Sequence, residues 1–235
     1  MKPTNDRWSE QNKCEARLAV VEVWKRLSGR RSIPKGRSYI SLCGEGGGPM
    51  SEVRSLCDSG LIAEGQFVGI NGKQAIIDDN AKLFPLARFV RGSWLRELGA
   101  LAREPDWNPA IVNADTQSVA GVEGATALAA GTLNIVSSTC LGPVLVAFNA
   151  MMSNPWSGET IPPGTFERSL WGLLENERMY GDRLPSYTYR MGGKRTVMET
   201  HFFWIDPRRG GRWRGRQRGI TLQNPVRRDT KKWRS

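Results

Sequence analysis

The 235-residue sequence has little of what a metal site or a membrane span requires. It contains one histidine and four cysteines, at positions 14, 43, 57 and 140, and no two cysteines form a CxxC pair. A zinc site or a disulfide framework is therefore not expected. No run of about 18 apolar residues could cross a bilayer, and the polar N-terminus has no apolar signal core. We accordingly expect a cytoplasmic chain with no metal and no membrane partner.

Acidic residues are nearly missing from the C-terminal segment 207–235. This segment holds 11 of the 34 basic residues and a single acid, Asp229, so it carries almost all of the formal charge of +11. Its low apolar content predicts disorder in isolation. Arginines that pair with phosphates, and Trp213 and Trp233 that can stack on bases, make RNA or DNA the expected partner. The alternative is a solvated tail or one that docks an acidic protein.

Apolar runs alternate with helix-like stretches through the middle of the chain. The pattern predicts strands at 38–43, 66–71, 88–90, 110–113 and 144–148, with helices between them at 50–59, 73–84, 93–102 and 121–133. Strands that alternate with helices form a parallel sheet covered on both faces. Residues 10–27 predict a further amphipathic helix that packs against the edge of this domain.

The alternation changes towards the C-terminus. A helix is expected at 165–179, followed by two β-rich runs, 187–191 and 196–205, which a Gly192-Gly193 turn joins into an antiparallel hairpin. A chain of this length can bury a single core. We expect an α/β fold with a doubly wound, mostly parallel seven-stranded sheet and an antiparallel C-terminal hairpin. The expected parts are an N-terminal helix and linker (1–37), the α/β domain (38–206) and the basic tail (207–235).

A glycine-dense turn, Gly44-Glu45-Gly46-Gly47-Gly48, follows the first predicted strand. Residues without Cβ can bend sharply and let a ligand approach the main chain, which favours a nucleotide-binding domain. Two other glycine loops fit less well. A dinucleotide fingerprint would need glycine where Pro49 stands, and a phosphate loop would need a lysine that Gly48-Pro49-Met50-Ser51 lacks.

The order of elements and the glycine turn resemble class I S-adenosylmethionine-dependent methyltransferases, over about residues 38–205. In that family a G-x-G-x-G turn follows the first strand, and Gly44, Gly46 and Gly48 match it. The resemblance implies a Rossmann-like fold, S-adenosylmethionine as cofactor and methyl transfer, with nucleic acid brought by the tail as a candidate acceptor. The alternative is a catalytically inactive methyltransferase-like module that binds nucleic acid or a partner protein.

The resemblance also implies cofactor-binding positions, some of them with altered chemistry. Where the family carries acids, this sequence has Leu42 in the first strand, Asn71 after the second and Ser93, next to Trp94, after the third. Asn71 can still hydrogen-bond a ribose hydroxyl, without the help of a charge. Ser93 and Trp94 are expected near the adenine. Glu45 is either a partner of the amino group of the methyl donor or a solvated loop carboxylate.

The end of the fourth strand is where the family places residues that face the methyl donor and the acceptor. We expect Asp115 to orient or deprotonate the acceptor, with Asn113 as its hydrogen-bonding partner. The alternative for Asp115 is a helix cap. Displacement of a methyl group demands alignment more than a reactive side chain. His201, beside Phe202, is expected to pack or to lie at the surface rather than to catalyse.

Overall fold

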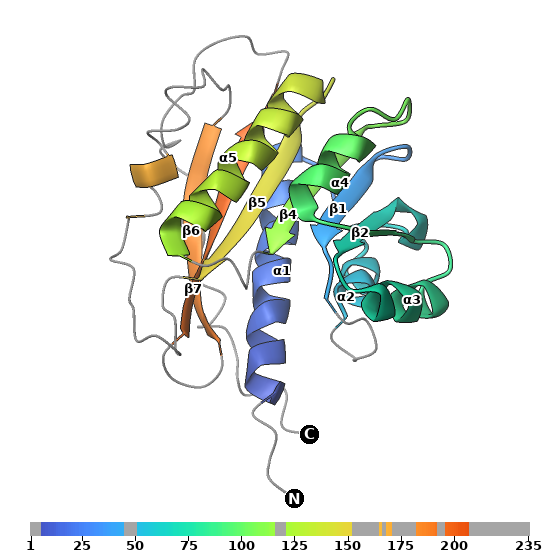
Figure 1. The fold of residues 1–235 in the computed structure, drawn as a ribbon, viewed down its shortest axis with the longest axis horizontal. Coiled ribbons are helices and arrows are strands. Elements are labelled where there is room, and N and C mark those ends of the chain that lie inside the picture. Colours follow the sequence, from blue (N-terminus) through green and yellow to red (C-terminus); the bar gives the residue numbers. More distant parts are fainter. Residues whose placement is uncertain are drawn as a thin grey trace, which may run out of the picture.

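One mixed sheet forms the centre of the molecule (Figure 1). The computed structural model describes residues 6–44, 51–115, 121–151, 165, 168–170, 182–191 and 196–206, and side chains for 17–44, 51–114, 124–149, 165, 168–170 and 200–206. The strands of this part of the chain are β1 (Ser38–Leu42), β2 (Phe67–Asn71), β3 (Arg88–Arg91), β4 (Pro109–Asp115), β5 (Val144–Met151), β6 (Asp182–Met191) and β7 (Thr196–Ile205). They form a 7-stranded sheet in the order β3-β2-β1-β4-β5-β7-β6.

The first five strands are parallel, and β7 runs antiparallel to both β5 and β6. The predicted α/β class and the antiparallel C-terminal pair are therefore confirmed. Strand β6 begins five residues before the predicted run and includes Pro185, a residue that sheets tolerate on edge strands or at bulges. A register shift between Leu184 and Tyr187 accommodates the proline on this edge strand.

Helices cover both faces of the sheet, as the alternating pattern predicts (Figure 1). Successive residues of a strand point to opposite faces, so Tyr39 and Leu145 join one buried cluster while Ile40 and Val146 join the other. The first cluster includes residues of α1 (Asp6–Ser28), α2 (Glu52–Asp58) and α3 (Gln74–Leu83), and the second includes residues of α4 (Trp94–Leu101) and α5 (Gly121–Thr139). A short 3-10 helix, η1 (Glu64–Gln66), precedes β2.

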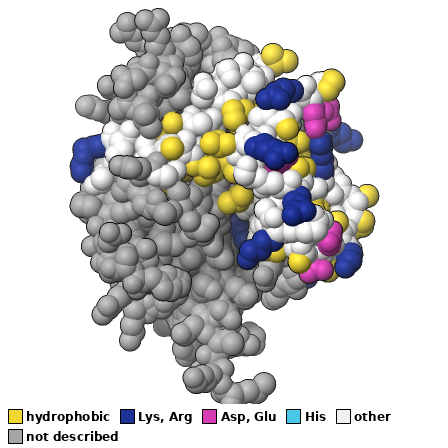
Figure 2. Space-filling view, in the orientation of Figure 1, with side chains coloured by type: hydrophobic (Ala, Val, Ile, Leu, Met, Phe, Trp, Pro, Cys, Tyr) yellow, Lys and Arg dark blue, Asp and Glu magenta, His cyan; other side chains and the backbone are white. Residues whose placement is uncertain are grey.

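Helix α5 extends six residues beyond its predicted end, to Thr139, and contains Gly131. A Cβ on Gly131 would lie 2.9 Å from a methyl carbon of Leu95, so the glycine lets α4 and α5 pack closely. Tertiary packing thus compensates for the low helix propensity of glycine. Figure 2 shows the α4 and α5 face, with Lys and Arg side chains spread mainly over the right-hand side, around α4 and α3, and fewer acidic ones among them.

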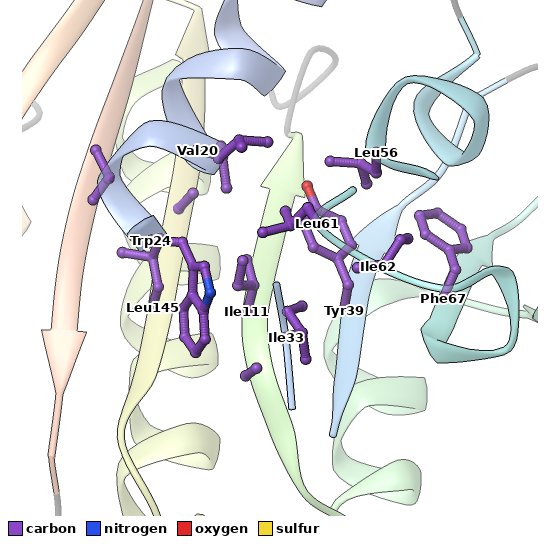
Figure 3. Packing of buried hydrophobic residues seen from close by; sticks show 14 of the residues in the cluster. Val20, Trp24, Ile33, Tyr39, Leu56, Leu61, Ile62, Phe67, Ile111 and Leu145 are labelled. Carbon is purple, nitrogen blue, oxygen red and sulfur yellow. The ribbon is translucent and has the colours of Figure 1, made fainter. Parts of the chain in front are cut away.

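The opposite face holds a large aromatic and aliphatic core (Figure 3). Trp24 of α1 is 1% exposed, and its ring lies 6.0 Å from that of Trp204 in β7, measured between centroids. Val20 of the same helix packs towards Ile111 and Leu145, so α1 shares its core with the sheet. Burying a large side chain of this kind stabilises the fold by roughly 1.5–3 kcal/mol.

Arg37 holds the amino ends of three strands together. Its guanidinium donates hydrogen bonds to the carbonyl oxygens of Pro109, where β4 begins, and Pro143, just before β5, the latter at 2.7 Å. The backbone N–H of Ser38 donates to the carbonyl of Asn108 at 3.2 Å. This leaves the carboxyl ends of the strands, at the other edge of the sheet, for a site. No helix in the described ranges is long and apolar enough to cross a membrane.

Candidate active site

The strand order reverses at β1, whose neighbours are β2 on one side and β4 on the other. The connections that leave β1 and β4 therefore run to opposite faces of the sheet, and open α/β sheets generally bind ligands at the carboxyl ends of such strands. Gly44 follows β1, Asn71 ends β2 and Asp115 ends β4. The fold thus brings most of the predicted site residues to one edge.

Gly44 begins the glycine turn and is exposed. A Cβ built on it would meet no atom of the described residues within 4 Å, so these residues leave space beside its backbone. The carbonyl oxygen of Gly44 accepts a hydrogen bond of 2.9 Å from the side-chain amide of Asn80 in α3. The carbonyl oxygen of Cys43 accepts a hydrogen bond of 2.6 Å from the side-chain amide of Asn71. Two amides therefore fix the two peptide groups at the head of the turn. The predicted ligands Glu45, Gly46 and Gly48 lie outside the described residues.

Both ends of the Asn71 side chain bond to the protein. Its nitrogen donates to Cys43, and its oxygen accepts from the backbone N–H of Lys73 at 2.8 Å. The oxygen keeps a second lone pair. Asn71 therefore shapes the turn, and one acceptor site on it remains for the predicted ribose contact.

Ser93 and Trp94 occupy different environments at the start of α4. Ser93 is exposed and its side chain caps no backbone group of the helix. Trp94 is 4% exposed, and its indole N–H donates to the hydroxyl of Thr132 in α5 at 2.8 Å. Trp94 thus ties α4 to α5 in the core, while the hydroxyl of Ser93 faces solvent at the sheet edge where the adenine was predicted.

A buried carboxylate, Glu52 of α2, lies at the centre of a polar network with residues of β1 and β4. It accepts hydrogen bonds from the hydroxyl of Tyr39 at 2.9 Å, from the hydroxyl of Ser41 at 2.9 Å to each oxygen, and from the amide of Asn113 at 3.0 Å. All four residues are buried, and Glu52 is 7% exposed. Burial, the charge of Glu52 and their hydrogen bond raise the pKa of Tyr39 well above its usual value, which keeps the phenol protonated as a donor.

No pattern in the sequence predicted this network. An acid in the first turn of a helix is normally exposed to solvent and interacts favourably with the helix dipole. In the sequence, Glu52 looks like such a residue. Tyr39 and Ser41 read as parts of a buried strand. Only the adjacency of β1, β4 and α2 reveals the cluster.

Asn113 is the one predicted catalytic residue whose side chain is described. Its nitrogen donates to Glu52 and to the hydroxyl oxygen of Tyr39, both at 3.0 Å. A carboxylate only accepts, so these contacts fix the orientation of the amide. The amide oxygen is buried and has no hydrogen-bond partner in the described part of the chain. Asp115 lies two residues further along β4, hence on the same face, opposite Asn149 of β5; its side chain is outside the described set.

Two remaining groups of candidates behave as structural residues. His201 is 1% exposed in β7, opposite Phe148 of β5, in keeping with the packing role predicted for it. Burial, and to a lesser degree the charge of Glu52, raise the pKa of Cys43 to about 12, so this thiol is inert at neutral pH. Within the described ranges no three His, Cys, Asp or Glu side chains gather as a metal site would require.

Comparison with known proteins agrees with this architecture. No protein-family model and no curated protein matches the sequence. An O-methyltransferase from Bacillus cereus, solved in complex with SAH, is similar with a TM-score of 0.50 and 13% identity, over 81% of this chain and 80% of that one. An S-adenosylmethionine-dependent methyltransferase from Clostridium acetobutylicum ATCC 824 is similar with a TM-score of 0.50 and 9% identity, over 82% and 92%. At such identities the likeness shows the fold alone, which is the class I Rossmann-like methyltransferase fold.

Proposed function

We propose that the chain binds S-adenosylmethionine at the carboxyl ends of β1 and β4 and transfers its methyl group to an acceptor. The observation that carries the proposal is the glycine-dense turn, which leaves β1 where the strand order reverses. The two similar proteins are methyltransferases, and that from Bacillus cereus was solved with SAH, the demethylated product. These likenesses support the choice of ligand among the nucleotides that bind at such strand ends.

The residues present fit this ligand. The space that the described residues leave beside Gly44 lets a ligand reach the peptide groups at the head of the turn. The buried amide oxygen of Asn113 has no partner among the described residues, although buried polar atoms normally have one. A bound molecule that donates a hydrogen bond would satisfy this oxygen.

S-adenosylmethionine supplies a methyl group on a sulfonium, which a nucleophile can displace directly. The chain has to align the reactants and exclude water. We assign the peptide groups of residues 44–48, with Glu45, to the amino-acid part of the ligand, and the free lone pair of Asn71 and the hydroxyl of Ser93 to the ribose and the adenine. We assign Asp115 to the acceptor, which it orients or deprotonates.

Nucleic acid is the acceptor class that the charge distribution favours. Besides the basic tail, exposed cations flank the proposed site: Lys73 follows β2, and Arg91 ends β3. Phosphate contacts position a nucleic acid without reading its sequence. These cations favour a nucleic acid that lies across the carboxyl ends of the strands. They do not identify the atom that accepts the methyl group.

Isothermal titration of the full chain with S-adenosylmethionine tests the proposal. We expect saturable binding and a rise in melting temperature with ligand concentration. The matched variant is Gly44→Val, whose side chain would enter this space, so it should keep the melting temperature of the free protein and weaken binding by at least about tenfold. Absence of binding to the unaltered chain would favour the inactive module instead.

A second comparison separates binding from transfer. Asp115→Asn should leave the dissociation constant of S-adenosylmethionine within about twofold and lower methyl transfer to an RNA or DNA acceptor by about 10²-fold or more. Unchanged transfer would leave Asp115 as a helix cap only.

A further inference from the structure

We propose that Glu52 supplies the negative charge that complements the sulfonium of the methyl donor, in place of the acids that the strand ends lack. This inference rests on the proposed function and adds a residue that sequence reasoning did not find. It concerns the charge of Glu52, as distinct from its contribution to packing.

Glu52 joins three elements of the proposed site. It follows the glycine turn in α2, it bonds to Ser41, three residues before Gly44, and it bonds to Asn113, two residues before Asp115. The cofactor region and the acceptor region meet at these points in the proposed site. The carboxylate therefore lies under the junction between them.

The donors around Glu52 satisfy an ionised carboxylate without neutralising its charge. Tyr39, Ser41 and Asn113 are uncharged donors, and among the described side chains no ion pair to Glu52 forms. Arg17 of α1 acts electrostatically on Tyr39, whose pKa it lowers against the larger effects that raise it. A carboxylate held in this way keeps its electrostatic attraction for a ligand, since few water dipoles screen it.

Asn113 adds a second acceptor to the same place. Because its nitrogen faces Glu52, its oxygen is turned away from the carboxylate, and this oxygen is buried with no partner in the described part of the chain. An anionic group and a bare carbonyl side by side suit a positively charged ligand group. They do not suit an anionic one such as a phosphate. This pairing distinguishes a sulfonium ligand from the other nucleotides that bind at glycine turns.

No described side chain at the carboxyl ends of β1, β2 and β3 is an acid, and Asp115 at the end of β4 is assigned to the acceptor. Leu42, Asn71 and Ser93 stand where the resemblance led us to expect carboxylates, and Asn71 is engaged with Cys43. The negative charge of Glu52 in α2 can therefore attract the sulfonium although Leu42, Asn71 and Ser93 are uncharged.

Glu52→Gln is the variant that tests the charge. A glutamine can keep every contact: its oxygen can accept from Tyr39 and Asn113, and its nitrogen can donate to the hydroxyl of Ser41. S-adenosylmethionine and S-adenosylhomocysteine differ in the sulfonium charge and its methyl group. We expect Glu52→Gln to raise the dissociation constant of S-adenosylmethionine about tenfold and that of S-adenosylhomocysteine less than about twofold.

The control is Ser41→Ala, which removes one donor and keeps the charge. It should alter both affinities by the same factor. An equal effect of Glu52→Gln on the two ligands would overturn the inference and leave the proposed function standing. If the unaltered chain binds neither ligand, the proposed function falls and the inference with it.

A measurement on the unaltered chain covers the case in which Glu52→Gln fails to fold. The probes are S-adenosylmethionine, S-adenosylhomocysteine and an analogue with an ammonium in place of the sulfonium. Glu52 should make both cationic ligands bind more tightly than the neutral one, by about tenfold. Equal affinities for the three would contradict the proposal.

Discussion

Side-chain amides perform two tasks near the glycine turn that carboxylates could not. Asn71 and Asn80 donate to the carbonyl oxygens of Cys43 and Gly44, which an ionised carboxylate cannot do because it has no donor. The family resemblance led us to expect an acid at position 71. The hydrogen bonds give a physical reason for an amide there, because an aspartate would place its oxygens against a carbonyl oxygen.

Asn71→Asp should therefore weaken the protein although it restores the residue type typical of the family. We expect a loss of about 1–3 kcal/mol in the free energy of unfolding, since the carbonyl of Cys43 loses its donor and faces a like partial charge. The affinity for S-adenosylmethionine should fall as well. Urea unfolding and calorimetric titration measure the two effects, with Asp79→Asn on the exposed face of α3 as control. Tighter binding by Asn71→Asp would show that ribose recognition outweighs the shaping of the turn.

Buried thiols make the stability of the fold sensitive to alkaline pH. The pKa of Cys43 is raised from 9.0 to about 12 and that of Cys140 to about 11, in both cases mainly by burial. Below pH 9 each thiol is protonated in the folded and unfolded states alike. Above pH 9 the unfolded chain loses the proton while the folded chain keeps it, so the free energy of unfolding falls as the pH rises towards the folded pKa.

Cys43→Ala should flatten this pH dependence. Each raised thiol contributes a slope of about 1.4 kcal/mol per pH unit between the two pKa values. Urea unfolding of both proteins at pH 8 and pH 10 measures the slope, and the static cost of the smaller side chain cancels because each protein is compared with itself. Cys57→Ala, at a half-buried thiol, should change the slope less. An identical slope in Cys43→Ala and the unaltered chain would mean that Cys43 does not stay protonated in the fold.

At the scale of elements, β1 organises both ends of the sheet. The residue before it, Arg37, fastens its amino end to β4 and the segment before β5, and Ser41 near its carboxyl end carries Glu52. A stabilising contact therefore lies at the amino end of β1, and the proposed site lies at its carboxyl end. Substitutions at the two ends should have separable effects.

Arg37→Met tests the stabilising end. It keeps an apolar stem and removes the donors to Pro109 and Pro143, so the free energy of unfolding should fall by about 1–3 kcal/mol. The dissociation constant of S-adenosylmethionine should stay within about twofold, because Arg37 lies at the edge opposite the proposed site. Arg31→Met, with the same change of charge at an exposed position, is the control. Equal stability of the two variants would remove the strand-fastening role.

At the scale of the whole molecule, charge divides the chain into two parts. Residues 1–206 carry 23 basic and 22 acidic side chains, while 207–235 carries 11 and one. Long-range attraction to a polyanion therefore resides in the tail, and the cations at the sheet edge can act only at short range. The tail would capture nucleic acid and the sheet edge would receive it.

Deletion of 207–235 should weaken binding of single-stranded RNA and flatten its salt dependence. The slope of log K against log salt should decrease by several units, since each lost phosphate contact on a single strand contributes about 0.7. Fluorescence anisotropy at several salt concentrations measures the slope. Exchange of Trp213 and Trp233 for alanine should reduce affinity with little change of slope, because stacking releases no counterions. Equal affinity with and without the tail would favour an acidic protein partner.

Much of the fold followed from the sequence because its signals act over short distances. Apolar periodicity and turn residues located β1 to β5 and their helices to within a few residues, apart from the longer α5, and the Gly192-Gly193 turn predicted the antiparallel pair. Gly44 and Asn113 lie at the carboxyl ends of β1 and β4, as the predicted elements imply, and their roles towards a ligand stay predictions. Whether Gly46, Gly48 and Glu45 contact the ligand stays a prediction, as they lie outside the described residues.

By itself, the sequence determined the type and order of the elements and the division of charge, since each depends on neighbouring residues or on composition. Only the tertiary structure decided which polar side chains meet. Tyr39 and Asn113 are 74 positions apart along the chain, yet they bond because β4 pairs with β1. A buried carboxylate such as Glu52 is stable only when separate elements bring donors to it, and that convergence is a property of the packed molecule.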